Sequence, residues 1–354
     1  MLQGMAIDFQ PIWFDSLGAK SSCTLVRTPD TTILIDPGCA VLQPRYPLPE
    51  EEKLKLLEEA LKAIVQAAAQ AEHIVITHYH HDHYLPFPEL YSGKKLWIKD
   101  PNRWINRSQW ERAREFLAGL AEAHDGTLPL KEPYREALAS EDPESGLRIA
   151  MAKDFGDYQE RREELLKKGR ERLARLKGWW QSQPWVDVEG LRAFGLEVEF
   201  ADGKSLRLGE TTLRFSEPLF HGIEYSTTGW VIAVVIEHSG EKLLYSSDLE
   251  GPTIEDYAEW IIKEGPTYLI LDGPTTYLLG YMLNRVNLQR AVVNARRIAE
   301  ECKPKLRVMI YDHHLLRDVR YQERTAEVWE ASSKVVTAAE WLGLEPLPRM
   351  LAHR

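Results

Sequence analysis

Short apolar runs separated by turn residues cover the first part of the chain and predict strands. Three such runs occur at residues 6–9, 23–26 and 31–35. Pro49 and the three glutamates after it predict the start of a helix, because proline suits the first turn and acidic side chains favour a helix N-terminus. Apolar residues then recur at helical spacing to about Ala71, and the apolar run at residues 74–76 predicts a fourth strand.

The pattern changes between about residues 90 and 190, where tryptophans and charged residues dominate. Leucines at helical spacing within residues 160–177 predict one long helix with a solvated charged face. The remaining chain predicts strands at residues 196–200, 205–208, 211–215, 230–237, 242–246, 268–272 and 307–311, and helices at residues 257–262, 286–302 and 323–342. This mixture indicates the α/β class.

Composition narrows the function and the location. Among the 354 residues, 44 are Lys or Arg and 54 are Asp or Glu, which gives a net charge of −10. We therefore do not expect nucleic acid to be the main partner, although a local basic groove is compatible with this balance. The three cysteines lack CxxC spacing, and no apolar run approaches the roughly 20 residues that a membrane-spanning helix needs. The N-terminus also lacks a signal-peptide pattern, so we expect a cytoplasmic protein with no membrane partner.

The densest cluster of chemical groups lies directly after the apolar run at residues 74–76. Four candidate metal ligands fall within six positions there: His78, His80, Asp82 and His83. Imidazole and carboxylate are the side chains that hold zinc and similar divalent ions. His81 lies between them and is interpreted as a spacer that points away. The cluster predicts a metal-dependent hydrolase.

Two metal ions need more ligands than one loop supplies. Three further candidates stand at the ends of apolar runs: His221, Asp248 and His313. A rigid sheet can bring such strand ends together from distant parts of a sequence.

The order of these residues resembles the metallo-β-lactamase superfamily of hydrolases. An Asp after the third predicted strand, an HxHxDH run, a lone His, a lone Asp and a last His follow one another at residues 36 to 313. The segments at residues 16–22, 35–38 and 312–318 also resemble a prokaryotic subgroup of predicted hydrolases that brings no known substrate. The resemblance implies a four-layer αββα sandwich of two mixed sheets, formed by a single domain that spans residues 1–354.

Carried over position by position, the resemblance implies two metal sites. The first site would hold His78, His80 and His221, the second would hold Asp82, His83 and His313, and Asp248 would bridge both. Asp36 would orient a ligand, and His314 is the alternative to His313. The expected cofactor is two Zn²⁺ per chain, with Mn²⁺ or Fe as alternatives. A bridging hydroxide would act as nucleophile, and Asp82 would also steady it or pass a proton to the leaving group.

The gap of 138 positions from His83 to His221 is longer than the family pattern implies, which predicts a helical, tryptophan-rich insertion at residues 90–190. This insertion could be a lid, a substrate-recognition subdomain or the surface of a homo-oligomer, and packing explains its tryptophans equally well.

The substrate class follows from the charges of the expected site. Two dications and two carboxylates favour a small anionic ester, lactone or phosphodiester; the alternative is a nucleic-acid phosphodiesterase of the RNA-processing type. A di-iron electron carrier would need a flavodoxin-like partner domain, which the sequence does not contain. Tyr277 and Arg317 are candidates for substrate binding; the alternatives are a structural loop for Tyr277 and an ion pair with Asp318 or Glu323 for Arg317.

Overall fold

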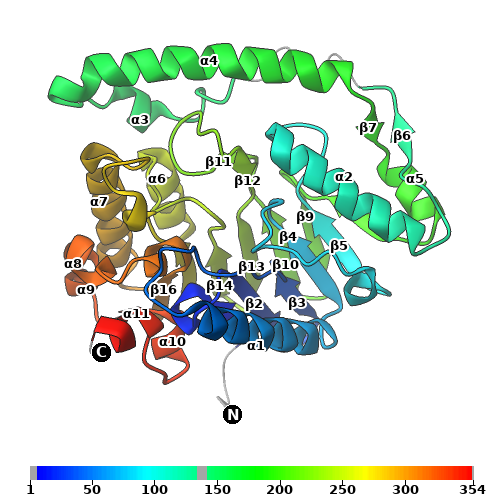
Figure 1. Cartoon of the computed structure of the whole chain (residues 1–354), viewed down its shortest axis with the longest axis horizontal. Coiled ribbons are helices and arrows are strands. Elements are labelled where there is room, and N and C mark those ends of the chain that lie inside the picture. Colours follow the sequence, from blue (N-terminus) through cyan, green and yellow to red (C-terminus); the bar gives the residue numbers. More distant parts are fainter. Residues whose placement is uncertain (1–5, 134–141, 353–354) are drawn as a thin grey trace.

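The apolar runs form two mixed sheets in the computed structural model, which describes residues 6–133 and 142–352 (Figure 1). The first sheet has the order β1-β2-β3-β4-β5-β8, with β1 at Asp8–Phe14, β2 at Ser22–Arg27, β3 at Thr32–Ile35, β4 at His73–Ile76, β5 at Lys95–Ile98 and β8 at Glu197–Phe200. The second has the order β17-β16-β15-β14-β13-β10-β9, with β17 at Val335–Val336, β16 at Val308–Asp312, β15 at Tyr268–Asp272, β14 at Glu241–Tyr245, β13 at Val234–His238, β10 at Thr211–Phe215 and β9 at Ser205–Leu208.

Side chains of the central strands are buried on both faces of each sheet. Ile33 of β3 and Ile310 of β16 belong to the core between the sheets. Their sequence neighbours Leu34 and Met309 point to the opposite face and pack under the helices. Successive side chains of a strand point to opposite faces, so such continuous apolar runs suit strands covered on both sides. Full burial of each large aliphatic side chain contributes roughly 1.5–3 kcal/mol.

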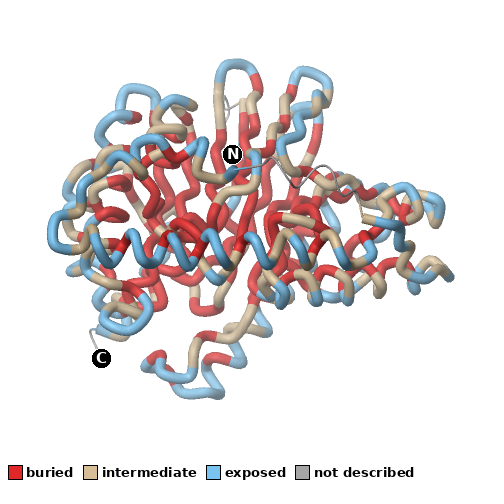
Figure 2. Tube along the Cα trace, turned by 90° about the horizontal axis from the view of Figure 1, so that it is seen from above, coloured by how far each residue is buried: buried red, intermediate tan, exposed pale blue. Residues whose placement is uncertain are grey.

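Helices cover the outer face of each sheet. Helix α1 (Glu50–Ala68) buries Ala60, Ile64 and Ala67 against the first sheet, at the spacing of one helix face. The second sheet is covered by α6 (Glu255–Glu264), α7 (Arg285–Glu301) and α9 (Ala326–Ala331). Figure 2 shows the buried strands at the centre of the molecule. The predicted α/β class and αββα sandwich are confirmed.

The predicted helix at residues 323–342 is wrong. Two short helices, α8 (Tyr321–Arg324) and α9, are followed by the strand β17, and then by α10 (Ala338–Trp341) and α11 (Leu347–Ala352). The β-branched pair Val335–Val336 adds a parallel edge strand beside β16. Thr337 then starts α10 through a capping box with Glu340, which satisfies backbone groups at the new helix start.

A long segment separates two neighbouring strands of the first sheet, β5 and β8. It contains α2 (Arg107–Glu122), α3 (Arg148–Ala152), α4 (Gln159–Ser182), α5 (Val188–Ala193) and the pair β6 (Leu130–Lys131) and β7 (Trp185–Val186). The predicted range 90–190 includes β5, which pairs with β4 in the first sheet. The helical segment itself lies between Ile98 and Glu197.

Helix α4 runs along the top of the view in Figure 1, above the hairpin of β11 (Leu219–Phe220) and β12 (Trp230–Val231). Trp180 of α4 is completely buried and packs edge-on against Trp104 and Trp230. Gly169 allows a second close approach, because a Cβ at this position would lie 2.5 Å from the Cβ of Tyr225. Helix α4 is therefore packed firmly on the β11–β12 hairpin, whose connecting loop begins with His221. Among the described residues, no helix has the length and apolarity that crossing a membrane requires.

Candidate metal centre

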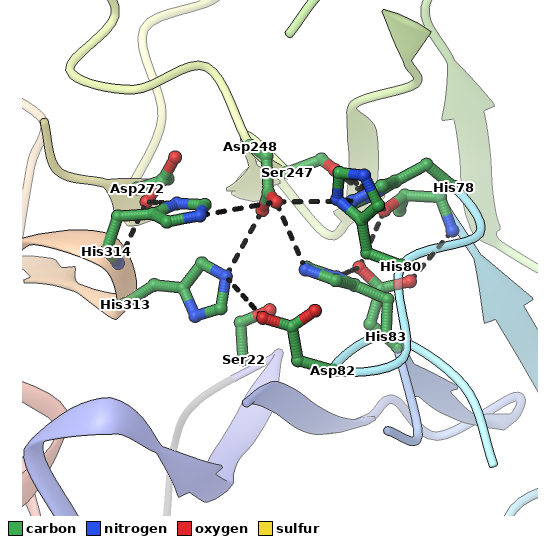
Figure 3. Close-up of polar contacts among 12 residues, drawn as sticks. Ser22, His78, His80, Asp82, His83, Ser247, Asp248, Asp272, His313 and His314 are labelled. Atoms are coloured by element: carbon green, nitrogen blue, oxygen red, sulfur yellow. Dashed lines mark hydrogen bonds and ion pairs between the residues drawn. The ribbon is translucent and has the colours of Figure 1, made fainter. Parts of the chain in front are cut away.

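Strand ends from both sheets meet where the predicted ligands lie. The motif at residues 78–83 follows β4, Asp248 follows β14, His313 follows β16 and His221 follows β11. Strands β14, β15 and β16 are parallel, as are β3 and β4, so their carboxyl ends open at one edge of the sandwich. Figure 3 shows the carboxylate of Asp248 at the centre, with the rings of His313 and His314 on one side.

Asp248 is the group on which the histidines converge. Its Oδ2 lies 3.2 Å from each of the Nε2 atoms of His78, His83 and His221. The Nε2 of His313 lies 3.4 Å from its Oδ1, and the Nε2 of His314 lies 4.0 Å from Oδ2. A single carboxylate therefore faces histidines from three separate parts of the chain.

Two neighbouring sets of ligand atoms lie around this carboxylate. One set contains His78, His80, His221 and Asp248, and the other contains Asp82, His83 and His313; within each set the ligand atoms lie within 4.8 Å of one another. All seven residues predicted as ligands thus lie together. His314 belongs to a further set with Asp248 and His313. His81 is exposed and belongs to none of these sets.

The donor atoms fit a bound cation. Both carboxylate oxygens of Asp248, the Nε2 of His83 and the Nε2 of His221 are buried and have no hydrogen-bond partner. Leaving buried polar atoms unpaired is costly, and most such atoms in folded proteins find a partner. Histidine and carboxylate donors are those that zinc, manganese and iron accept.

The pKa values of the histidines at the centre are shifted in opposite directions. Burial and the neighbouring His83 lower the pKa of His78 to about 4. Burial also opposes protonation of His83 and His221, but Asp248, together with Asp36 for His83 and Glu250 for His221, raises each pKa to about 10. Asp248 thus favours protonation of two of the imidazoles that face it, and a bound cation would compete with those protons.

Asp36 lies behind the histidine motif and holds it in place. It accepts hydrogen bonds from the backbone and hydroxyl of Thr77 at 2.7 and 2.6 Å, from the Nδ1 of His83 at 2.8 Å and from the hydroxyl of Tyr245 at 2.8 Å. A carboxylate that accepts from the rear nitrogen of a histidine fixes which ring nitrogen faces a metal.

Further supporting residues were not predicted from the sequence. Asp15 accepts from the Nδ1 of His313 at 2.8 Å, Asp272 lies 3.0 Å from the Nδ1 of His314, and Glu250 lies 3.3 Å from the Nδ1 of His221. A usable signal existed: a ligating histidine needs an acceptor for its other nitrogen, and Asp15 and Asp272 stand at the ends of strands.

Arg317 lies inside the centre. It donates from Nε to Asp15 at 2.6 Å and from a terminal nitrogen to Asp82 at 2.8 Å. The alternative ion pairs are made by other arginines, since Arg320 pairs with Glu323 and Arg324 with Asp318.

Tyr277 also lies near the centre. Burial raises its pKa, while the neighbouring Arg317 acts in the opposite direction. Binding of substrate by Tyr277 and Arg317 stays a prediction.

The backbone at the centre is strained. Asp36, Ser247 and His313 adopt φ angles of 49°, 54° and 62°, a region that non-glycine residues rarely occupy. Gly38 allows another close approach, because a Cβ there would lie 2.1 Å from the backbone nitrogen of Tyr84. Such conformations persist only where the surrounding structure holds them, and they concentrate at functional sites.

Comparison with known proteins identifies relatives along almost the whole chain. Residues 18–92 match the model of the metallo-beta-lactamase superfamily. A UPF0282 protein of Methanopyrus kandleri is 34% identical over 95% of this chain and 94% of its own length. A UPF0282 protein of Korarchaeum cryptofilum is 32% identical over 97% of this chain and 92% of its own length.

Solved structures also resemble the chain. The metallo-beta-lactamase fold protein YhfI from Bacillus subtilis is 13% identical, with 94% of this chain and 95% of that chain covered and a TM-score of 0.43. The short form of human tRNase Z is 12% identical, with 87% of this chain and 92% of that chain covered and a TM-score of 0.34.

Proposed function

We propose that this chain, which belongs to the UPF0282 family and has the metallo-beta-lactamase fold, is a hydrolase that uses two metal ions, most simply Zn²⁺. The observation that carries this proposal is the position of Asp248. Its buried, unpaired carboxylate faces His78 and His221 of one ligand set and His313 of the other. A carboxylate shared by two sets of ligands suits a pair of metals held close together.

Bound there, two metal ions would lower the pKa of a water molecule toward 7 and polarise an oxygen of the substrate. The protein supplies the orientation. Asp36 and Asp15 hold the rear nitrogens of His83 and His313, so that the Nε2 atoms of both rings point inward.

Asp82 is the proposed catalytic carboxylate. Burial alone would raise its pKa, but Arg317, His83 and His313 hold the pKa well below its usual range. Asp82 therefore stays ionised and can accept a proton from, or orient, the attacking water molecule. Arg317 fixes its position through the contact at 2.8 Å.

The proposed substrate is a small anionic ester, lactone or phosphodiester. Two divalent cations bring more positive charge than Asp82 and Asp248 neutralise, which favours a negatively charged reacting group.

The metal content of matched variants tests the proposal. The purified wild-type chain should contain two metal ions when measured by inductively coupled plasma mass spectrometry. D82A and H221A should each lose at least one. H81A is the control, because His81 lies between ligands in the sequence but is exposed, and it should keep both metals. Full metal content in both D82A and H221A would contradict the proposed ligands.

Turnover tests the reaction. Metal-loaded protein should hydrolyse bis(p-nitrophenyl) phosphate or a member of a lactone panel, and D82A should lose at least 100-fold in kcat, the usual scale for a general acid or base. Absence of turnover on both substrate types would refute the proposed substrate class.

A further inference from the structure

A cleft beneath α4 is lined by three arginines. It has a volume of about 310 Å³, and its lining includes Arg107 at the start of α2, Arg172 and Arg175 of α4, and the polar side chains of Asn106, Ser226 and Thr227. The two arginines of α4 are three positions apart, so they lie on the same face of the helix.

Within the part of the chain that the structure describes, these guanidinium groups have no acidic partner. In the described ranges, none of the three arginines forms an ion pair, and Arg107 contacts only the face of Trp179, at 5.2 Å from the ring centroid. Burial and the like charge of Arg175 lower the pKa of Arg172. Two cations held near each other without a counter-ion are unfavourable, and an anion in the cleft would relieve this repulsion.

Three other arginines of the same helix are paired with carboxylates. Arg162 pairs with the buried Glu224 at 3.1 Å, and Arg170 pairs with Glu144 at 2.6 Å. Arg161 pairs with Glu164 on the exposed face. Among the described residues, Arg172 and Arg175 are the arginines of α4 that lack a carboxylate partner, in a chain whose net charge is −10. Arg172 is half-buried, and Arg107 and Arg175 are exposed.

The cleft shares lining residues with a second cavity. Arg172, Ser226 and Thr227 also line a second cavity of about 330 Å³, which reaches Thr228 and Glu250. Thr228 donates to the backbone oxygen of His221 at 3.0 Å, and the carboxylate of Glu250 lies 3.3 Å from the Nδ1 of the same histidine. The cavity that shares Arg172 with the cleft is thus lined by two residues that contact a predicted metal ligand, His221.

We propose that Arg107, Arg172 and Arg175 bind a second, non-reacting phosphate-type anion of the substrate, while its scissile bond lies at the metal centre. This inference rests on the proposed hydrolase function and narrows its substrate to small molecules with two separated anionic groups. Guanidinium groups suit this role because they stay charged and form paired hydrogen bonds to phosphate oxygens. The helical segment between β5 and β8 thereby supplies substrate recognition.

Binding of inorganic phosphate tests the inference without any turnover. The full-length chain is treated with chelator, so that phosphate cannot bind to metal, and is titrated by calorimetry. The wild type should bind one phosphate. R172A/R175A should bind it at least tenfold more weakly, and R172Q/R175Q, which keeps more of the side-chain volume, should do the same. R161A/K167A removes the same charge from the same helix at exposed positions outside the cleft, and it should bind like the wild type.

Each outcome decides the matter. Equal binding by all variants, or equal loss in both charge-matched double variants, would overturn the arginine site while leaving the hydrolase proposal untouched. Arginine-dependent phosphate binding without turnover of any tested substrate would retain the site and refute the hydrolase proposal. A single-stranded RNA ten-mer that binds at least 100-fold more tightly than phosphate, through the same arginines, would overturn the small-molecule class in favour of nucleic acid.

Discussion

Residues at the centre act in pairs, in which one residue faces inward and a second residue behind it holds it in place. His313 illustrates this arrangement, since its Nε2 faces Asp248 while its Nδ1 contacts Asp15. The inward set could be predicted from the sequence, because six consecutive positions with this ligand pattern and later strand-end residues are distinctive. Of the residues behind them, Asp36 was predicted, whereas the contact of Asp15 with Arg317 was not, because these residues are separated by 302 positions and nothing local connects them.

The space around Gly38 gives a prediction at this scale. G38A should lower the free energy of unfolding by roughly 1–3 kcal/mol and reduce metal content, because the added methyl group would collide with the backbone of His83 and Tyr84 and displace the ligand loop. Urea unfolding and metal analysis measure both effects.

G119A is the control. Gly119 lies in α2 with no atom near its missing Cβ, and alanine favours helices, so this variant should be as stable as the wild type or slightly more stable. A G38A variant that retains wild-type stability and metal would show that the loop can move aside.

Elements were predicted well where one periodicity persisted. The strand at residues 268–272 and the helix near residues 286–302 matched closely because apolar spacing and a following turn agreed with burial. The prediction of one C-terminal helix failed because the apolar spacing there did not agree with burial. Val335 and Val336 pair with β16, and this tertiary pairing, which the local sequence does not encode, overrides helix propensity.

An ion cluster ties α6 to the second sheet and gives a pH-dependent prediction. Glu264 at the end of α6 contacts Arg214 of β10 at 2.7 Å and Lys242 of β14 at 2.8 Å. Burial would raise the pKa of Glu264, but these two cations lower it from 4.5 to about 2. Because the folded-state pKa lies below the unfolded one, the carboxylate stabilises the fold above about pH 4.5, and this contribution disappears as the pH falls toward 2.

E264Q should therefore be less stable than the wild type at pH 7, by about 1 kcal/mol once solvent screening of this partly exposed group is considered. The difference should narrow steadily between pH 5 and pH 2 in urea-unfolding measurements. E210Q, which changes an exposed glutamate without an ion pair among the described residues, should show no such pH-dependent difference. A constant difference across the whole range would mean that lost packing, rather than charge, explains the effect.

For the whole molecule, the centre joins parts that are distant in sequence. Ligands come from the first sheet, from the hairpin of β11 and β12 and from the second sheet, so bound metal would hold these parts together. Such binding stabilises the folded state only, by about 4 kcal/mol when free metal is 1,000 times its dissociation constant.

Chelation should accordingly lower the Tm of the wild type by several degrees in differential scanning calorimetry, and added Zn²⁺ should restore it. The D248N variant lacks the shared carboxylate, so chelator should leave its Tm nearly unchanged. If the wild type is equally insensitive, the centre contributes no metal-dependent stability.

The pairing of β5 with β8 has a consequence for how this molecule could diversify. The helical excursion leaves the sheet after Ile98, at the end of β5, and re-enters it at Glu197, at the start of the adjacent parallel strand β8. Its two ends are therefore anchored by two strands that pair with each other, whatever lies between them. Evolution can lengthen, shorten or exchange the intervening module while the sandwich and its reactive pocket keep their geometry, so that one scaffold can acquire new molecular preferences without rebuilding its chemistry.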